Sequence, residues 1–442
     1  MFINKLLAVA ALCTLAVSAF ATPHIQHWQS ASGARVLFVE DHDIPMLDVA
    51  VSVPAGSSYD QAGKSGVAGM THALLDQGAD GLSEDDISRG MADIGAQLGG
   101  SFDQDRASVS LRTLSHAAER DQALKIMAQV LQHPVFPDAI LAREKTRLLS
   151  ALKEAETKPE AIADKAFQKA VFGNHPYALP VSGDIPGVEQ ITTAELKAFY
   201  LAHYNASQSV VAIMGDVTHA QAEAIAQQLT AQLPAGSGVA ALPAVAMKIP
   251  YSELRIFHPA SQSHILIGVP GMSRDDPDYF PLYVGNYILG GGGFVSRLMN
   301  EVREKRGLAY SVYSYFMPLK QPGAFQIGLQ TKKEQADGAL ALVRKTVADF
   351  VAKGPTEKEL TAAKQNIVGG FPLRIDSNRK ILDYLSIIGF YDMPLTYLDD
   401  FTSRVEKVTV AQIRSAYARH IHPEKMATVI VGAPETDSGS AK

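Results

Sequence analysis

Residues 66–80, GVAGMTHALLDQGAD, include the first side chains in the sequence whose types and spacing could support chemistry. The pattern predicts a short amphipathic helix with Gly78 placed to end it, and it puts His72 and Asp76 one turn apart on the same face. An imidazole and a carboxylate in this arrangement could be two ligands of a first-row metal ion, although a catalytic site needs a third. The sequence offers no identifiable third ligand. The alternative is that His72 faces a cleft or packs with a hydrogen bond to Asp76.

A second candidate site lies in residues 289–316, LGGGGFVSRLMNEVREKRGLAYSVYSYF. The glycine run predicts a close approach of the backbone to another group, and a helix at 296–306 and an aromatic strand at 308–316 are expected to follow. Arg303 and Tyr310 could converge on one ligand, because a guanidinium suits a carboxylate or a peptide carbonyl and a phenol can donate to a developing oxyanion. The alternative is a solvated Arg303 and a packed Tyr310.

Other common catalytic motifs are missing from the sequence. The four consecutive glycines lack the Lys-Ser/Thr of a P-loop and the spacing of a dinucleotide fingerprint, and no G-x-S-x-G nucleophile elbow is present. His175, in the turn FGNHPYALP, is expected to be structural rather than catalytic. These observations leave the two segments above as the places where function is expected.

The first 21 residues have the features of a secretory signal peptide. Lys5 provides the positive start, an apolar run follows, and Ala19-Phe20-Ala21 is a small-x-small cleavage site, with a membrane anchor as the alternative. Cleavage after Ala21 would send the chain to the periplasm or outside the cell and would remove Cys13, the one cysteine, so no disulfide, thiolate or Cys-based metal site is expected. The net charge would pass from −6 to −7. An acidic chain without basic runs is a poor nucleic-acid binder, and we expect no membrane span.

The sequence also contains an internal repeat. VEQITTAELKAFYLAHYNASQSVVAIMGDV begins at Val188, and VEKVTVAQIRSAYARHIHPEKMATVIVGAP begins at Val405, about 217 residues later. Each copy predicts a Thr N-cap, a helix, a polar turn and a β-branched strand that ends at glycine. Matching positions are Val188, Glu189, Thr192, Ala194, Tyr200, His203 and Gly215 with Val405, Glu406, Thr409, Ala411, Tyr417, His420 and Gly432.

The repeat predicts an α+β fold of two equivalent halves, each a largely antiparallel sheet packed with helices, with a cleft between the halves. The expected segments are a first half at 22–232, a Pro- and Gly-containing linker at 233–250, a second half at 251–434 and a disordered tail at 435–442. Strands are expected at 36–39, 47–53 and 107–114 in the first half and at 264–269 and 324–330 in the second.

The glycine run, Ser296-Arg297-Leu298 and the phrase REKRGLAYSV resemble the C-terminal half of the pitrilysin/insulinase-type inverted-zincin metallopeptidases, which include the mitochondrial-processing-peptidase branch and its small bacterial subunits. The resemblance covers nearly the whole mature chain and implies a clam-like subunit. It implies that Arg303 and Tyr310 reach across a cleft to the substrate. It also implies peptide contacts at the glycine run and at the strand 107–114, which resembles the family's substrate-pairing edge strand: Gly290, Gly291, Gly292, Gly293, Ser296, Ala107 and Val109.

The same resemblance implies that the zinc site is lost. The family carries H-x-x-E-H on a helix of the first half, and a third ligand, a glutamate, lies on a helix far downstream. The first His position falls on Gly69, the general base on His72 and the second His on Ala73. The downstream glutamate falls on Ala151, and a shifted alignment would place Glu154 there. We therefore expect no metal ion in this chain and zinc in a partner subunit.

The resemblance implies a non-zinc subunit of an exported heteromeric peptidase, inactive alone, that pairs with a homologous zinc-bearing subunit as a heterodimer or larger complex. Arg303 and Tyr310 would position an extended peptide and help to stabilise the oxyanion. An isolated chain can also pair with itself. The alternative is a non-enzymatic peptide-binding or scaffold protein of the same fold. A self-sufficient hydrolase would require a site that the sequence does not reveal.

Overall fold

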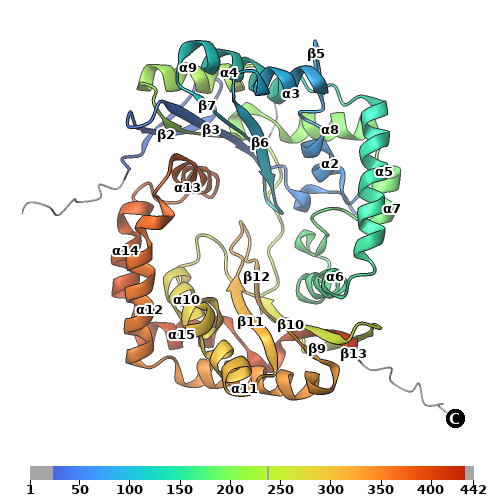
Figure 1. Cartoon of the computed structure of the whole chain (residues 1–442), viewed down its shortest axis with the longest axis vertical. Coiled ribbons are helices and arrows are strands. Elements are labelled where there is room, and N and C mark those ends of the chain that lie inside the picture. The colour runs from blue at the N-terminus through green and yellow to red at the C-terminus, as the bar shows by residue number, and fades with distance from the viewer. Residues whose placement is uncertain (1–22, 236–237, 434–442) are drawn as a thin grey trace, which may run out of the picture.

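Two β-sheets surrounded by helices make up residues 23–235 and 238–433, which are the residues that the computed structural model describes (Figure 1). The predicted leader at 1–21 and the predicted tail at 435–442 lie outside these residues. No helix within the described ranges is both long enough and apolar enough to cross a bilayer.

The first sheet has the strand order β1-β2-β8-β3-β7-β6, so β1 and β6 are its edges. All of its pairs are antiparallel except β2 with β8. The central strand β8 has the sequence VVAIMG and is buried along its whole length, as expected for β-branched and apolar residues covered on both faces. Its strands are β1 (Gln26–Gln29), β2 (Arg35–Glu40), β3 (Met46–Val53), β6 (Gln97–Phe102), β7 (Ala107–Leu114) and β8 (Val210–Gly215).

The second sheet has the order β11-β12-β10-β13-β9, with β11 and β9 at its edges and with β13 and β9 as its parallel pair. A short hairpin, β4 (Gly78–Ala79) and β5 (Leu82–Ser83), stands apart from both sheets. The predicted α+β fold with two largely antiparallel sheets is confirmed. The strands of the second sheet are β9 (Ser252–Phe257), β10 (Gln262–Pro270), β11 (Ala309–Phe316), β12 (Ala324–Lys332) and β13 (Ala427–Ala433).

Helices fill the connections between the strands. Before the second sheet they are α2 (Val67–Ala73), α3 (Glu84–Ala92), α4 (Ala117–Gln132), α5 (Asp138–Ala155), α6 (Pro159–Phe172), α7 (Ile185–Gln190), α8 (Thr193–His203) and α9 (His219–Thr230). Those that follow are α10 (Tyr279–Asn286), α11 (Ala336–Lys353), α12 (Glu357–Gly370), α13 (Asn378–Phe390), α14 (Tyr397–Lys407) and α15 (Val410–His420). Two π-helical turns, Tyr287–Gly291 and Met299–Glu304, flank the glycine run.

The repeated units have the same local structure as well as similar sequences. Thr192 and Thr409 both cap their helices in capping boxes, α8 and α15 respectively. At the ends of these helices, Nδ1 of His203 lies 3.1 Å from the carbonyl oxygen of Pro54, and Nδ1 of His420 lies 3.1 Å from that of Gly271. The accepting residues are separated by the same interval as the histidines. The two halves of the chain therefore repeat their hydrogen bonds in equivalent places.

The two sheets exchange helices with each other (Figure 1). Helix α13 follows the second sheet's strands in sequence but packs on β8, β3 and β2 of the first sheet, whereas α6 precedes the second sheet and packs on β13 and β10. Both contacts are tight. A Cβ at Gly389 of α13 would lie 2.4 Å from Val210, and a Cβ at Gly268 of β10 would lie 2.7 Å from the Phe167 ring of α6. The predicted halves at 22–232 and 251–434 follow the repeat, whereas the cores beneath α13 and α6 contain residues from both halves.

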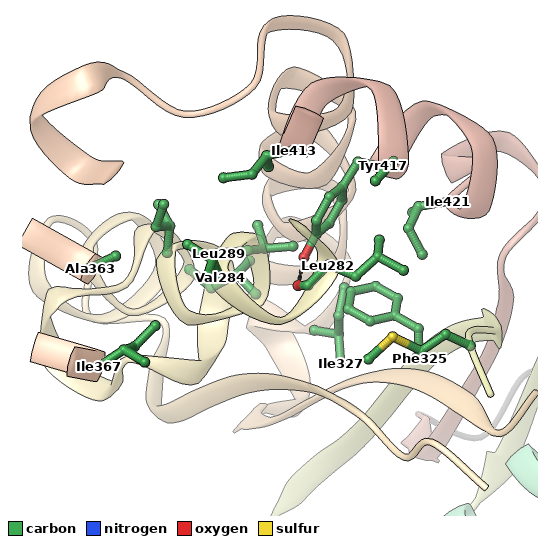
Figure 2. Close-up of a cluster of buried hydrophobic side chains, with 14 of the residues drawn as sticks. Leu282, Val284, Leu289, Phe325, Ile327, Ala363, Ile367, Ile413, Tyr417 and Ile421 are labelled. Atoms are coloured by element: carbon green, nitrogen blue, oxygen red, sulfur yellow. Dashed lines mark hydrogen bonds between the residues drawn. The ribbon is translucent and has the colours of Figure 1, made fainter. Parts of the chain in front are cut away.

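Helices α10, α11, α12 and α15 cover the other face of the second sheet. Figure 2 shows Leu282 of α10 and Tyr417 of α15 close to Phe325 and Ile327 of β12, while Ala363 and Ile367 of α12 lie on the side of Val284 and Leu289. The Tyr417 ring lies fully inside this cluster, and its hydroxyl donates to the carbonyl oxygen of Leu282 at 3.4 Å. The second sheet is therefore closed on one face by its own helices and on the other by the exchanged helix α6.

A buried carboxylate joins the ends of both exchanged helices. Asp105, in the turn between β6 and β7, accepts hydrogen bonds from the hydroxyls of Tyr177 (2.6 Å) and Tyr391 (3.0 Å). It also accepts one from the backbone N–H of Lys320, at 2.6 Å, in the turn between β11 and β12. Tyr177 follows α6 and Tyr391 follows α13. Burial raises the pKa of the Asp105 carboxyl, and the hydroxyl and N–H donors oppose this shift.

The exchange of α13 predicts that a cavity in this helix destabilises the first sheet. Leu385→Ala removes a fully buried side chain and should lower the free energy of unfolding by about 3 kcal/mol. Trp28 on β1 is the one tryptophan of the chain, so urea unfolding followed by its fluorescence monitors the first sheet directly. Leu201→Ala, at an exposed position of α8, is the control and should change the free energy by less than about 0.5 kcal/mol. Equal effects of both variants would contradict the exchange.

The Asp105 cluster predicts a second large effect on stability. Asp105→Ala leaves two phenols and one backbone N–H buried without their acceptor, so the free energy of unfolding should fall by about 3 kcal/mol or more. Urea denaturation measures this change, and Asp121→Ala, at a mainly exposed aspartate, serves as the control. A loss below about 1 kcal/mol would show that water satisfies these donors in the variant.

Candidate functional site

The helix predicted to correspond to the zinc-binding helix is α2. Asp60 fixes its start, because the two carboxylate oxygens accept from the backbone N–H groups of Gly66 (2.7 Å) and Ala68 (2.8 Å). Gly69 and His72 are partly exposed and Ala73 is exposed, so all three positions lie on the accessible side of α2. All three positions are therefore accessible to a bound ion or substrate.

The predicted length of this helix is wrong. α2 ends at Ala73, Leu74 already has φ −99° and ψ 2°, and Gly78 enters β4 with φ +147°. Asp76 thus lies in a turn beyond the helix and does not share a helical face with His72. Its Oδ1 accepts from the side-chain amide of Gln77 at 2.9 Å. The expected metal-ligand pair and the alternative His72–Asp76 hydrogen bond both depended on a helix that continues past Ala73.

His72 instead packs against the edge strand of the first sheet. Its ring stacks on Phe102 of β6, with centroids 5.6 Å apart and planes 22° apart, and a Cβ at Gly100 would lie 3.0 Å from its Cε1. Burial lowers the pKa of His72, so the imidazole is neutral at pH 7. Its buried Nδ1 has no hydrogen-bond partner among the described residues. This histidine is a packed ring at the position predicted to correspond to the family's general base.

The residues around α2 do not fit a zinc ion. Gly69 and Ala73 offer no ligand atom, Ala151 is exposed on α5, and Glu154 forms an ion pair with Lys158 at 2.6 Å. Within the described residues, one set of His, Asp or Glu side chains is close enough to share a metal ion: Asp276, Asp278 and His420. That set belongs to the second half, and there Arg419 already binds both oxygens of Asp278 at 2.6 and 2.7 Å.

The predicted edge strand is also wrong. Strand β7 lies inside the sheet, between β3 and β6, and Ala107 and Val109 are buried, so neither can contact a bound peptide. The free edge belongs to β6, Gln97–Phe102, whose sequence QLGGSF was not predicted as a strand because its two glycines weaken the pattern. The alternation of Leu98, Gly100 and Phe102 just before the turn at 103–106 was the available signal.

A groove lies on each side of β6. The first, called the β6–α6 groove, has a volume of about 1050 Å³ and lies between Phe102, α6 and residues 178–185. Its apolar wall includes Ile162, Leu179, Val181, Ile256 and Met317. The second, called the β6–α13 groove, has a volume of about 540 Å³ and lies between β6, β7, β3 and α13. A peptide that extends the first sheet at β6 would have side chains directed to both grooves.

The structure brings Arg303 and Tyr310 together at the edge of the second sheet. The Arg303 guanidinium lies between two aromatic rings, 4.7 Å from the centroid of Phe294 and 4.9 Å from that of Tyr310. Tyr310 is 83% exposed, and it lies in the irregular part of β11, where the pairing register with β12 shifts. Sequence reasoning missed Phe294, although it directly follows the glycine run.

The glycine run serves the packing of β11. A Cβ at Gly290 would lie 2.4 Å from Oγ and 2.6 Å from N of Ser314, so only glycine permits this approach to the strand. Gly291 and Gly292 similarly crowd Asn286 and Tyr287, whereas Gly293 has φ +61° and makes the turn before Phe294. Ser296 is fully buried, and its hydroxyl donates to the carbonyl oxygen of Gly293 at 2.7 Å. The Ser296 side chain therefore cannot bind a peptide, contrary to expectation.

His175 has the structural position expected from its sequence context. Its Nδ1 accepts from the backbone N–H of Tyr177 at 3.1 Å, and its Nε2 lies 2.9 Å from the carbonyl oxygen of Pro243. The ring thus connects the turn after α6 to the segment that precedes the second sheet. Both nitrogens are occupied by backbone groups, which leaves the imidazole no free atom for catalysis.

Comparisons with known proteins identify both halves of the chain. Residues 35–185 match the model of "Insulinase (Peptidase family M16)", and residues 190–367 match that of "Peptidase M16 inactive domain". The structure is similar to the crystal structure of a peptidase M16 inactive domain from Pseudomonas fluorescens, with 41% identity and a TM-score of 0.89. The similarity covers 92% of this chain and 98% of that one.

Two further relatives differ in what their names state. The non-peptidase homolog YmxG of Helicobacter pylori is 27% identical over 91% of this chain and 92% of its own length. The periplasmic protease PqqL from Escherichia coli shares the fold with a TM-score of 0.78 at 16% identity, and the match covers 93% of this chain but 46% of that one. The family matches, the identity to the Pseudomonas fluorescens protein and the shared fold lead to one conclusion: the chain belongs to peptidase family M16, the insulinase family.

Proposed function

We propose that this chain is the non-zinc subunit of an exported, heteromeric M16 peptidase. It binds an extended peptide and contributes Arg303 and Tyr310 to a site whose zinc ion and hydrolytic water come from a homologous partner subunit. The observation that carries the proposal is the exposed stack of Phe294, Arg303 and Tyr310 in a chain whose zinc-ligand positions are Gly69, Ala73 and Ala151.

The chemistry of the stack suits peptide positioning. The two rings restrain the Arg303 guanidinium, so less side-chain entropy is lost when it donates to a peptide carbonyl. Tyr310 carries its hydroxyl on a mainly exposed side chain, where it can donate to the oxyanion that develops at the scissile carbonyl. Neither group can activate water by itself, which is why the proposal requires a partner.

The free edge of β6 supports the peptide-binding part of the proposal. An unpaired edge strand presents backbone N–H and C=O groups that can pair with an extended peptide. Folded proteins present few such segments, so unfolded peptides are the favoured substrates. The partly buried His72–Phe102 stack packs α2 against this edge strand.

Chain length supports the pairing of two such subunits. The chain corresponds to 46% of the PqqL chain, so one PqqL molecule is about as long as two chains of this kind. The signal-peptide pattern of residues 1–21 supports a periplasmic or secreted location.

A second candidate function is a non-enzymatic peptide-binding or scaffold protein. The relative from Helicobacter pylori named a non-peptidase homolog favours it, since that similarity covers nearly the full length of both chains. In that case β6 would still bind peptide, but Arg303 would have no catalytic partner. The first prediction below distinguishes these functions, and the second tests the peptide binding that both require.

Hydrolysis by a mixed complex tests the catalytic role. The chain is co-expressed with an H-x-x-E-H relative from the same genome, and kcat/KM is measured on an unstructured peptide. Arg303→Ala and Tyr310→Phe should each lower kcat/KM by about 100-fold, because each removes a donor to the oxyanion or the carbonyl. Arg147→Ala and Tyr251→Phe, at exposed positions elsewhere, are the matched controls. Unchanged turnover in the Arg303 and Tyr310 variants refutes their catalytic role.

Backbone-modified peptides test the edge-strand role in both candidate functions. N-methylation of alternate residues along one edge of an extended peptide removes the N–H groups that would pair with β6, so binding should weaken by at least about tenfold. N-methylation along the opposite edge should have little effect, which provides the control. Fluorescence anisotropy with the full chain measures both affinities. Equal affinities for the two modified peptides would show that binding does not use strand pairing.

A further inference from the structure

The floor of the β6–α13 groove is made of small polar residues. Gly99 and Ser101 of β6 pair with Ser110 and Ser108 of β7, so their side chains share one face of the sheet. The same face is apolar farther in, where Ala50 and Ala212 pack beneath α13. The change from apolar to small polar residues leaves the groove open between α13 and the free edge.

Arg106 lies at this groove with part of its guanidinium unpaired. Its side chain is only 15% exposed, and Nε donates to Oδ2 of Asp103 at 3.1 Å. The rings of Phe390 and Tyr391 lie 5.8 and 6.0 Å from its Cζ, which fixes its orientation. Nη1 is buried and has no hydrogen-bond partner among the described residues. A buried charged donor without an acceptor is costly, and an acceptor in the groove would remove that cost.

The charged groups around the groove balance in number but leave Nη1 of Arg106 without an acceptor among the described residues. Three guanidinium groups and two carboxylates line it: Arg106, Arg112, Arg379, Asp48 and Asp383. Arg112 and Asp48 neutralise each other through a two-point hydrogen bond at 2.8 and 3.1 Å. Asp383 is then the one remaining carboxylate of the lining, and both Arg106 and Arg379 act on it electrostatically. With Asp103, which pairs with Nε of Arg106, three carboxylates face three guanidinium groups, so recognition of a carboxylate would depend on the open donor Nη1 and on the exposed Arg379 rather than on an excess of charge.

We propose that the β6–α13 groove binds a carboxylate of the peptide that pairs with β6, through Nη1 of Arg106 and the guanidinium of Arg379. The carboxylate is either an Asp or Glu side chain or the C-terminus of the peptide. This inference rests on the proposed pairing of a peptide with β6 and adds the chemical class of the substrate.

The geometry of strand pairing also predicts which side chains the peptide should carry at alternate positions. Side chains of a paired strand point alternately to the two faces of the sheet. Those on the face of Gly99 and Ser101 would enter the β6–α13 groove, and those on the opposite face would meet Phe102 and the apolar β6–α6 groove. The preferred peptide is thus extended and alternates apolar residues with acidic ones, or places its C-terminal carboxylate at Arg106.

Three labelled octapeptides test this proposal against the full chain by fluorescence anisotropy. The first alternates Val with Glu, the second alternates Val with Gln, and both have amidated C-termini; the third is the Val/Gln peptide with a free C-terminal carboxylate. The Val/Glu peptide should bind about tenfold more tightly than the amidated Val/Gln peptide. If the free-acid peptide gains a similar factor, the C-terminus is the source of the carboxylate that is recognised.

Variants of the two arginines complete the test. Arg106→Gln and Arg379→Gln should each reduce the preference for Glu over Gln, whereas Arg147→Gln, on the exposed face of α5, should retain it. Arg379 is exposed, so its variant does not depend on core packing, and thermal unfolding verifies the fold of the Arg106 variant. Equal binding of all three peptides to the unmodified chain, or a preference that survives in both variants, overturns the proposal while peptide pairing stands. If none of the peptides binds, peptide pairing with β6 is overturned as well.

Discussion

The structure depends on one packing constraint: neither sheet can bury its inner face with helices from its own part of the chain. The first sheet is covered by α13 and the second by α6, so each core includes residues from both sides of the linker. Removing apolar surface from water is the main favourable term in folding, and here that term requires both halves at once. The Asp105 carboxylate strengthens this dependence, since it holds the segments that follow α6 and α13 to the tips of two hairpins.

The same exchange forms the candidate binding region. Strand β6 is one edge of the first sheet, α6 lines the groove on one side of it, and α13 lines the groove on the other. Because Asp105 lies in the turn that follows β6, it also fixes the edge strand relative to both helices. A peptide bound at β6 would therefore contact elements whose mutual positions are determined by buried interactions rather than by flexible loops.

The two segments predicted to correspond to the family's catalytic site differ in this chain. At α2 the predicted ligand positions hold Gly69 and Ala73, and the predicted position of the general base holds His72, a partly buried, neutral histidine stacked on Phe102. At β11 the Arg303–Tyr310 pair is exposed and is supported by Phe294. A stack of this kind adds little to the stability of an exposed edge, which is consistent with a role in contacts with another molecule.

Local patterns were enough to predict much of this fold from the sequence. The repeat, the strands β2, β3, β10 and β12 and the Thr192 and Thr409 caps depend on residues close together in the chain, and so does the proximity of Arg303 to Tyr310 around one turn. The residue types at 69 and 73 alone exclude a zinc ligand at these two positions, where the family resemblance predicts histidines. Three features required the tertiary structure: the exchange of α6 and α13, the edge position of β6 instead of β7, and the unpaired Nη1 of Arg106 beside the groove. Each depends on contacts between distant segments, such as Tyr391 with Asp105 across 286 residues, and no local pattern of hydrophobicity or turn residues records such contacts.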